Sequence, residues 1–321
     1  MDVCLMIEGQ EGVTWDQWVA LALACEEHGF AGLFRSDHYV SFSRPAEFGS
    51  LDAWATLAAL GPMTERIRLG TLVSPVTFRH PSVLAKSVVT ADHASGGRVE
   101  LGMGAGWFEE EHRAFGFPFP ETGERMAMLE EQVEIVHRLW DRDEDEVSFQ
   151  GSHYRLDGCH ALPKPLQEPH PPLILGGHGG PRALRLAAAW ADEYNLTFQG
   201  TADRCREVRD SLSIACERQG RDPGAVRLSV MTFTMVGTDR AELERRAARW
   251  LTGSGETIDP GEYLDGLPPE RLRGTPQQLL ESLGELAKAG VERIMMQHLL
   301  HDDLEALALI GREIIPEAAG L

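Results

Sequence analysis

Short apolar runs alternate with amphipathic segments along the whole chain. The segment 14–29 predicts a helix, with Thr14 as its N-cap and Gly29 as its stop. The apolar runs are continuous rather than alternating, which is typical of parallel strands buried on both faces. Eight such runs predict strands at 3–9, 32–36, 66–75, 98–106, 173–177, 193–198, 226–237 and 291–299.

Eight strand-then-helix units are the number that closes a TIM (β/α)8 barrel. An open, doubly wound sheet is the structural alternative. No linker divides the chain, so we expect one domain spanning residues 1–321. Loop-rich insertions are expected at the carboxyl-terminal rim, and substrate selectivity is expected to lie in them. They cover residues 108–120, 147–172 and 252–274, and the second is compatible with a short hairpin.

Composition narrows the class of protein. The chain has 321 residues, of which 43% are hydrophobic and 25% charged, as in soluble globular enzymes. No apolar run is long enough to span a bilayer and no signal-like segment is seen, so a cytoplasmic location is expected. The net charge of −20 argues against nucleic-acid or anionic-membrane partners and leaves a small-molecule substrate. Five scattered cysteines indicate reduced thiols rather than disulfides or zinc ligands.

Polar residues and glycines gather where the predicted strands end. Reactive residues of such barrels lie at the carboxyl ends of the strands. The second strand runs through GLFRSDHY (32–39) and ends on Asp37 and His38. This pair is either a helix cap with an exposed loop histidine or part of a reaction site.

Two glycine-rich stretches follow other strands. GGHGG (176–180) places Gly176, Gly177, His178 and Gly179 before Pro181, which suits the first turn of a helix. It is either a flexible turn or a cradle of backbone amides for phosphate. The His178 side chain either points into a pocket at this rim or lies exposed on the loop.

The second stretch is GMGAGW (102–107), which contains Gly104, Ala105, Gly106 and Trp107. The spacing does not match the Rossmann fingerprint, because the third glycine comes one residue early. Trp107 is a packing residue or one wall of a pocket for a planar ring.

No metal site is expected. The run Glu109, Glu110, Glu111 and His112 cannot easily converge on one ion, so it predicts a solvated helix start. His298 and His301 receive the same interpretation.

Several of these stretches together resemble the bacterial luciferase-like monooxygenase superfamily, and are most similar to its coenzyme F420-dependent oxidoreductase branch. The stretches are GLFRSDHY, the block from Arg66 to Pro120, HPPLILGGHGG (170–180) and the segment 274–299. The resemblance implies a barrel, commonly dimeric, with a deazaflavin ring across its carboxyl-terminal rim.

The resemblance also implies roles for individual residues. Asp37 would help bind the cofactor, and His38 would lie near its reactive carbon and assist proton transfer. A non-prolyl cis peptide at Leu72–Val73, with Ser74 beside it, would support the back of the ring. Gly104, Ala105, Gly106 and Trp107 would line the ring, and Gly176, Gly177, His178 and Gly179 would hold the phosphate of the tail. Arg79 is a candidate cation for that acidic tail.

The resemblance implies hydride transfer between the deazaflavin C5 and a small organic substrate, with an imidazole exchanging the accompanying proton. An FMN-dependent monooxygenase is the alternative, and a cofactor-binding protein without turnover is a third possibility. Sugar-phosphate dehydrogenases of this branch carry a catalytic glutamate where this chain has Trp107. The departure favours a less polar substrate.

Overall fold

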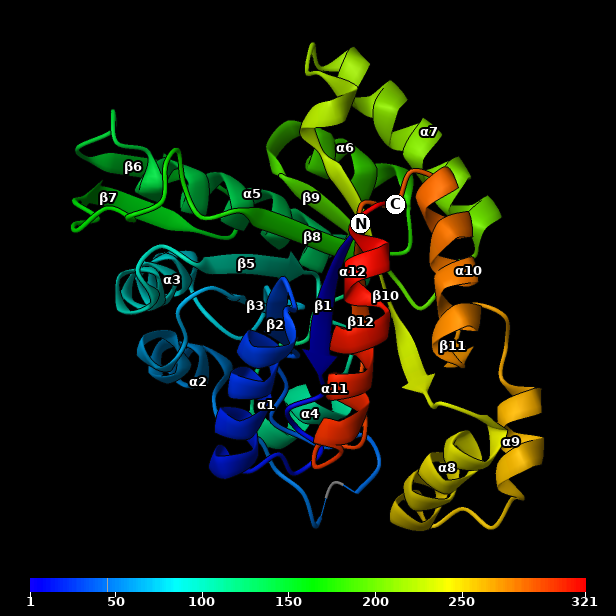
Figure 1. Ribbon diagram of the computed structural model, residues 1–321. Coiled ribbons are helices and arrows are strands. Elements are labelled where there is room, and N and C mark those ends of the chain that lie inside the picture. The colour runs from blue at the N-terminus through cyan, green and yellow to red at the C-terminus, as the bar shows by residue number, and fades with distance from the viewer. Residues whose placement is uncertain (45) are drawn as a thin grey trace.

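The computed structural model describes residues 1–44 and 46–321 and has eight parallel strands closed into a barrel (Figure 1). Closure occurs because β9 and β12 both pair with β10. The predicted TIM barrel is therefore confirmed, and the open sheet is excluded. In the order of their pairing, the barrel strands are β1 (Asp2–Ile7), β2 (Gly32–Arg35), β3 (Arg68–Thr71), β5 (Val99–Gly104), β8 (Leu173–Gly177), β9 (Glu193–Thr197), β10 (Arg227–Val236) and β12 (Arg293–Gln297).

Helices cover the outside of the barrel, as Figure 1 shows. The first has the predicted ends, because Thr14 and Gln17 form a capping box and Gly29 adopts a left-handed conformation at the carboxyl end. Its buried face packs Trp18 and Leu21 against the strands. The larger helices are α1 (Trp15–His28), α2 (Ala53–Leu60), α3 (Pro81–Ser95), α5 (Thr122–Trp140), α6 (Pro181–Trp190), α7 (Ala202–Arg218), α8 (Arg240–Ser254), α10 (Pro276–Lys288) and α11 (Leu304–Glu313).

The barrel interior is layered. At the amino-terminal end, Arg293 is paired with Glu100 at 2.7 Å and with Glu193 at 3.0 Å. Above this buried ion cluster lies an apolar layer formed by side chains from five strands and the cis bulge. Its members are Cys4, Met6, Phe34, Leu72, Ile174, Met231 and Met295. The polar rim residues therefore sit on a packed floor, not over an open channel.

Smaller elements complete the rim. The segment after β5 contains α4 (Glu109–Phe115), and the segment after β10 contains α9 (Pro260–Gly266) and β11 (Leu272–Gly274), which pairs with β10. Short β4 (Ser74–Pro75) pairs with β5, and α12 (Ile315–Ala318) ends the chain. The segments 108–120 and 252–274 thus lie at the carboxyl-terminal rim, as expected.

The third expected rim insertion, 147–172, lies in part at the opposite end. Its predicted hairpin is present as β6 (Val147–Gln150) and β7 (Arg155–Cys159). However, the segment follows helix α5 and leads into the amino-terminal end of β8. There, Gln167 donates a hydrogen bond to Asp92, near the end of α3, and another to the backbone carbonyl of Val99, at the start of β5. The expectation that this insertion borders the site is wrong for the part that leads into β8, because that part follows a helix and lies at the amino-terminal end. The hairpin turn reaches the start of α3, where the ring centroids of Tyr154 and His80 lie 5.4 Å apart.

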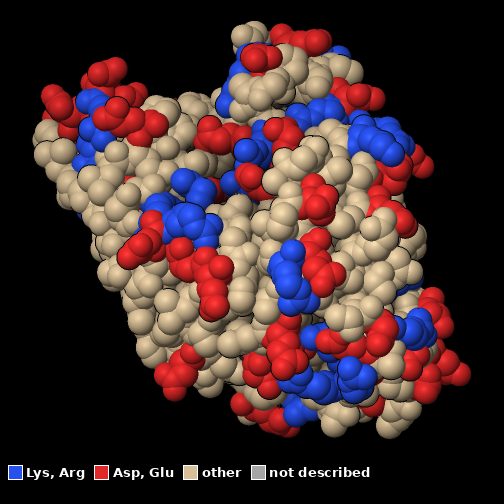
Figure 2. All heavy atoms as spheres, viewed as in Figure 1, with Lys and Arg blue, Asp and Glu red and all other residues tan. Residues whose placement is uncertain are grey.

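Charge is mixed over the surface in view. Figure 2 shows Lys and Arg side chains lying mostly beside Asp and Glu, with no continuous basic area on that face. Within residues 1–44 and 46–321, no helix is long and apolar enough to cross a membrane.

Candidate active site

Asp37 lies just past the end of β2 and is fully buried. Ser74 donates its hydroxyl to Asp37 Oδ2 at 2.6 Å, and Arg79 approaches the same oxygen at 2.5 Å. The Trp54 indole N–H donates to Ser74 Oγ at 3.1 Å. Asp37 and Ser74, two of the predicted site residues, are therefore brought together, and Arg79 and Trp54 of other segments hold them.

Arg79 joins two carboxylates. It contacts Asp37 and Asp52, the latter at 2.6 Å, and donates to the Tyr39 hydroxyl at 3.0 Å. Burial disfavours its charge, yet the two carboxylates raise the pKa of Arg79 above its ordinary value. Its side chain is only 11% exposed. Arg79, the candidate cation for an acidic cofactor tail, is therefore already paired with two carboxylates, and its role toward the tail stays a prediction.

His38 is held by a buried carboxylate from helix α4. Its Nδ1 lies 2.8 Å from Glu111 Oε2, while Glu111 Oε1 accepts the backbone N–H groups of Tyr39 and Val40. Glu111 is fully buried, whereas the His38 side chain keeps 14% exposure. A carboxylate can only accept, so Nδ1 carries the proton and Nε2 is the nitrogen available for exchange.

The interpretation of 109–112 as a solvated helix start is wrong for two of its four residues. Glu109 and Glu110 are exposed, but Glu111 and His112 are buried. His112 Nε2 lies 2.6 Å from the Thr77 hydroxyl, and burial lowers the pKa of His112. The available signal was periodicity: Phe108, Glu111, His112 and Phe115 follow the i, i+3, i+4, i+7 spacing of one helix face.

The predicted bulge lies between β3 and β4. The peptide bond between Leu72 and Val73 is cis, which confirms the prediction. A Cβ on Gly104 would lie 2.7 Å from Val73 Cγ2, and one on Gly176 would lie 3.0 Å from Val73 Cγ1. Glycines of β5 and β8 thus leave the space that the Val73 side chain fills, and Leu72 is buried in the barrel layer.

An aromatic group borders His38 on its exposed side. The Trp107 side chain is 63% exposed, and its ring centroid lies 5.9 Å from that of His38 and 5.1 Å from that of Phe42. Phe108 completes this aromatic group at 5.1 Å from Phe42. Gly106 makes the turn at φ +78° that precedes Trp107, with half-buried Ala105 before it. Trp107 is therefore a rim residue and not part of the core.

The GGHGG loop ends β8 and leads to Pro181 at the start of α6. Gly177 is half-buried there, and Gly179 adopts φ +76° and donates its N–H to the Tyr194 hydroxyl at 2.9 Å. His178 is exposed. Arg204 of α7, which the sequence did not single out, donates to the His178 carbonyl at 2.7 Å. It brings a cation to this loop.

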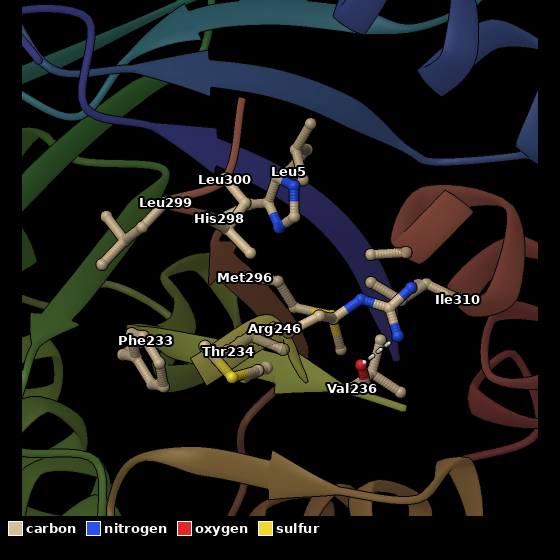
Figure 3. A pocket seen from close by; sticks show the side chains of 12 residues that line it. Leu5, Phe233, Thr234, Val236, Arg246, Met296, His298, Leu299, Leu300 and Ile310 are labelled. Carbon is tan, nitrogen blue, oxygen red and sulfur yellow. Dashed lines mark hydrogen bonds between the residues drawn. The ribbon is translucent and has the colours of Figure 1, made fainter. Parts of the chain in front are cut away.

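A small pocket lies elsewhere, between the ends of β10 and β12 and helix α11 (Figure 3). Its volume is about 10 Å³, which admits at most one water molecule. His298 lines it, is buried and has no partner for Nε2 among the residues that the structure describes, so the expectation of a solvated histidine is wrong there. Burial lowers the pKa of His298 and that of the half-buried His301 to about 4. This pocket cannot hold a ring system.

Comparisons with known proteins agree with the fold. Residues 3–314 match the luciferase-like monooxygenase family. The F420-dependent glucose-6-phosphate dehydrogenase of Nakamurella multipartita is 31% identical, covering 94% of this chain and 92% of that enzyme. The FMNH(2)-dependent dimethylsulfone monooxygenase of Pseudomonas putida is 27% identical over 80% of this chain and 76% of that enzyme.

Among solved structures, the monooxygenase RslO1 from Streptomyces bottropensis superposes with a TM-score of 0.83. Its sequence is 21% identical, and the match covers 98% of this chain and 99% of that chain. At that identity the likeness concerns the fold. The family match spans nearly the whole chain and agrees with the resemblance seen in the sequence. The chain therefore belongs to the luciferase-like monooxygenase family.

Proposed function

We propose that this protein is a coenzyme F420-dependent oxidoreductase that transfers hydride between the deazaflavin and a small organic substrate. Its relationship to the F420-dependent dehydrogenase of Nakamurella multipartita supports the choice of cofactor. The observation that carries the proposal is the pairing of His38 Nδ1 with buried Glu111, which leaves Nε2 available at the rim.

The residues present suit a flat heterocycle with a phosphorylated tail. Val73 of the cis bulge packs against Gly104 and Gly176, so the bulge itself would be the surface against which a ring lies. The GGHGG loop before α6 and the Arg204 guanidinium, which also pairs with Glu207 at 3.0 Å, would be the groups that meet a phosphate. The Asp37 carboxylate already accepts hydrogen bonds from Ser74 and Arg79. Its contribution to cofactor binding would therefore be to hold Ser74 in place.

The chemistry divides between cofactor and protein. A bound deazaflavin supplies or accepts hydride at C5. His38 Nε2 would exchange the accompanying proton with the substrate, while Glu111 keeps the ring of His38 in one orientation and one tautomer. Trp107 and Phe42 would cover the reacting atoms and exclude water.

The test of the cofactor is a fluorescence titration of the purified protein with F420 and, separately, with FMN. We expect saturable quenching with the deazaflavin and much weaker binding of FMN. Tight FMN binding without deazaflavin binding would favour the second candidate, a flavin monooxygenase, which the relationship to the Pseudomonas putida enzyme keeps open.

The test of the proton role is His38→Ala. General acid–base residues contribute on the order of 100- to 10,000-fold, so turnover should fall at least about 100-fold with cofactor affinity retained. His160→Ala is the matched control, because His160 is exposed on the hairpin at the other end of the barrel. Full turnover by His38→Ala would remove the proposed proton role.

We also propose that the substrate is not a sugar phosphate. Trp107 stands where the sugar-phosphate dehydrogenases of this branch have a glutamate, and its side chain is 63% exposed at the rim. Turnover of glucose 6-phosphate at a rate comparable to that of a preferred substrate would contradict this proposal.

A further inference from the structure

A second buried acid lies at the same rim. Glu8 directly follows β1 and is 7% exposed. Cys4 and Met6, the alternate residues before it, belong to the interior apolar layer of the barrel. Because side chains of a strand alternate between its two faces, Glu8 continues this inner row toward the carboxyl-terminal mouth.

The partners of Glu8 are uncharged. Gln297, the last residue of β12, donates to Oε1 at 2.6 Å, and Gln10 donates to Oε2 at 2.9 Å. Gln10 in turn accepts the Ser36 hydroxyl at 2.5 Å. This network joins the ends of three strands and stops one residue before Asp37.

Glu8 lacks an ionic partner. Across residues 1–44 and 46–321, no Lys, Arg or His nitrogen lies within 4.0 Å of its carboxylate. The other buried acids near the rim differ, since Asp37 is paired with Arg79 and Asp303 with Arg246. A buried carboxylate without a cation is costly, so such a group is usually completed by a partner of opposite charge.

The aromatic group next to His38 favours the same kind of partner. The exposed rings of Trp107 and Phe42 present π faces that attract cations. The loop that carries Phe42 adjoins that of Glu8, because Glu11 accepts the Phe42 backbone N–H at 2.8 Å. The net charge of −20 adds a long-range attraction for cations.

We infer that the substrate is an organic cation, such as a protonated amine or imine on a planar frame, whose charged nitrogen is bound by Glu8. This deepens the proposed function and rests on it. Gln297 and Gln10 hold the carboxylate in place, and the aromatic group packs on the frame of the substrate. Phosphorylated sugars would be repelled by the same carboxylate.

The test uses three flat bicyclic probes of similar size, measured by calorimetry on the F420-loaded protein. They are 1-methylquinolinium (a cation), coumarin (neutral) and 2-naphthoate (an anion). The cation should bind at least about 10-fold more tightly than the others, as expected of a charged group given a buried partner. Glu8→Gln should reduce that preference to less than about 2-fold.

The matched control is Glu109→Gln, which removes one negative charge from an exposed position beside Trp107. It should keep the preference for the cation. Equal binding of the three probes, no binding of the cation, or a preference unchanged in Glu8→Gln would overturn the inference. Tighter binding of 2-naphthoate would also overturn it.

Failure of this inference is separable from failure of the proposed function. F420 binding is measured first, without any probe, and tests the cofactor alone. Normal F420 binding with no preference for the cation rejects only the substrate class. An unchanged circular dichroism spectrum of Glu8→Gln shows that a lost preference is not a lost fold.

Discussion

His38 Nδ1 and Glu111 Oε2 lie 2.8 Å apart, although 73 positions separate the two residues in sequence. The same carboxylate accepts the backbone N–H of Val40, at 3.0 Å. One buried side chain of α4 therefore fixes both the imidazole and the loop that carries it. It acts as a positioning residue for the proposed proton exchange.

Glu111→Gln tests this relationship. A glutamine can still accept from the backbone, but its NH₂ would then face Nδ1 and favour the tautomer with the proton on Nε2. We expect kcat to fall by about 10- to 100-fold while the Kd for F420 changes by less than about 2-fold.

The control for that experiment is Glu110→Gln, on the exposed side of the same helix. It should leave both constants unchanged. An equal loss of kcat in both variants would mean that charge on α4, and not the contact with His38, sets the rate.

Asp37→Asn tests the buried ion pair with Arg79. When one partner of a buried ion pair is removed, the charge of the other remains buried without its partner. Asp52 would compensate the Arg79 charge only in part. The free energy of unfolding should fall by about 3 kcal/mol in urea denaturation. Asp302→Asn, which breaks an exposed pair with Arg249, should cost less than about 1 kcal/mol. Similar losses in the two variants would contradict the assignment.

Gly102→Ala tests the close approach of β3 and β5. A Cβ at this position would lie 2.1 Å from the Thr71 carbonyl oxygen, so the backbone must move. We expect a loss of about 3 kcal/mol, as for overpacked cores. Gly284→Ala has open space in helix α10 and should instead stabilise the protein by about 0.5–1 kcal/mol. A stable, fully active Gly102→Ala protein would show that this contact is looser than described.

Acid should destabilise the protein through His298. Burial lowers its pKa from 6.5 to about 4, so the unfolded chain binds this proton more readily between those values. Stability is therefore retained above pH 6.5 and lost as the pH falls toward 4. The loss attributable to His298 is about 2 kcal/mol at pH 5.

His298→Gln should remove that part of the pH dependence. The free energy of unfolding is measured at pH 7 and pH 5, with His301, Asp303 and Arg246 left in place. His160→Gln, on the exposed hairpin, is the control. A wild-type pH dependence in His298→Gln would show that His298 takes up no proton on unfolding in this range.

The barrel could be predicted because it is encoded locally. The run 3–9 is continuously apolar from Val3 to Ile7, and parallel strands buried on both faces favour that pattern. Eight such strands favour closure, and closure places Asp37, His38 and Trp107 at one rim. The cis bond at Leu72–Val73 came from the family resemblance, since no local pattern encodes it.

What only the tertiary structure decided is the partner of each polar side chain. We expected Glu111 to be solvated, because three consecutive acids are usually exposed. Its partner in the buried site is His38, which follows β2 and is distant in sequence. Arg79 was a candidate cation for the cofactor tail, and only the fold shows that Asp37 and Asp52 pair with it. Hydrophobic patterning sets which face of an element is buried, whereas an ion pair depends on the distance between segments far apart in the chain.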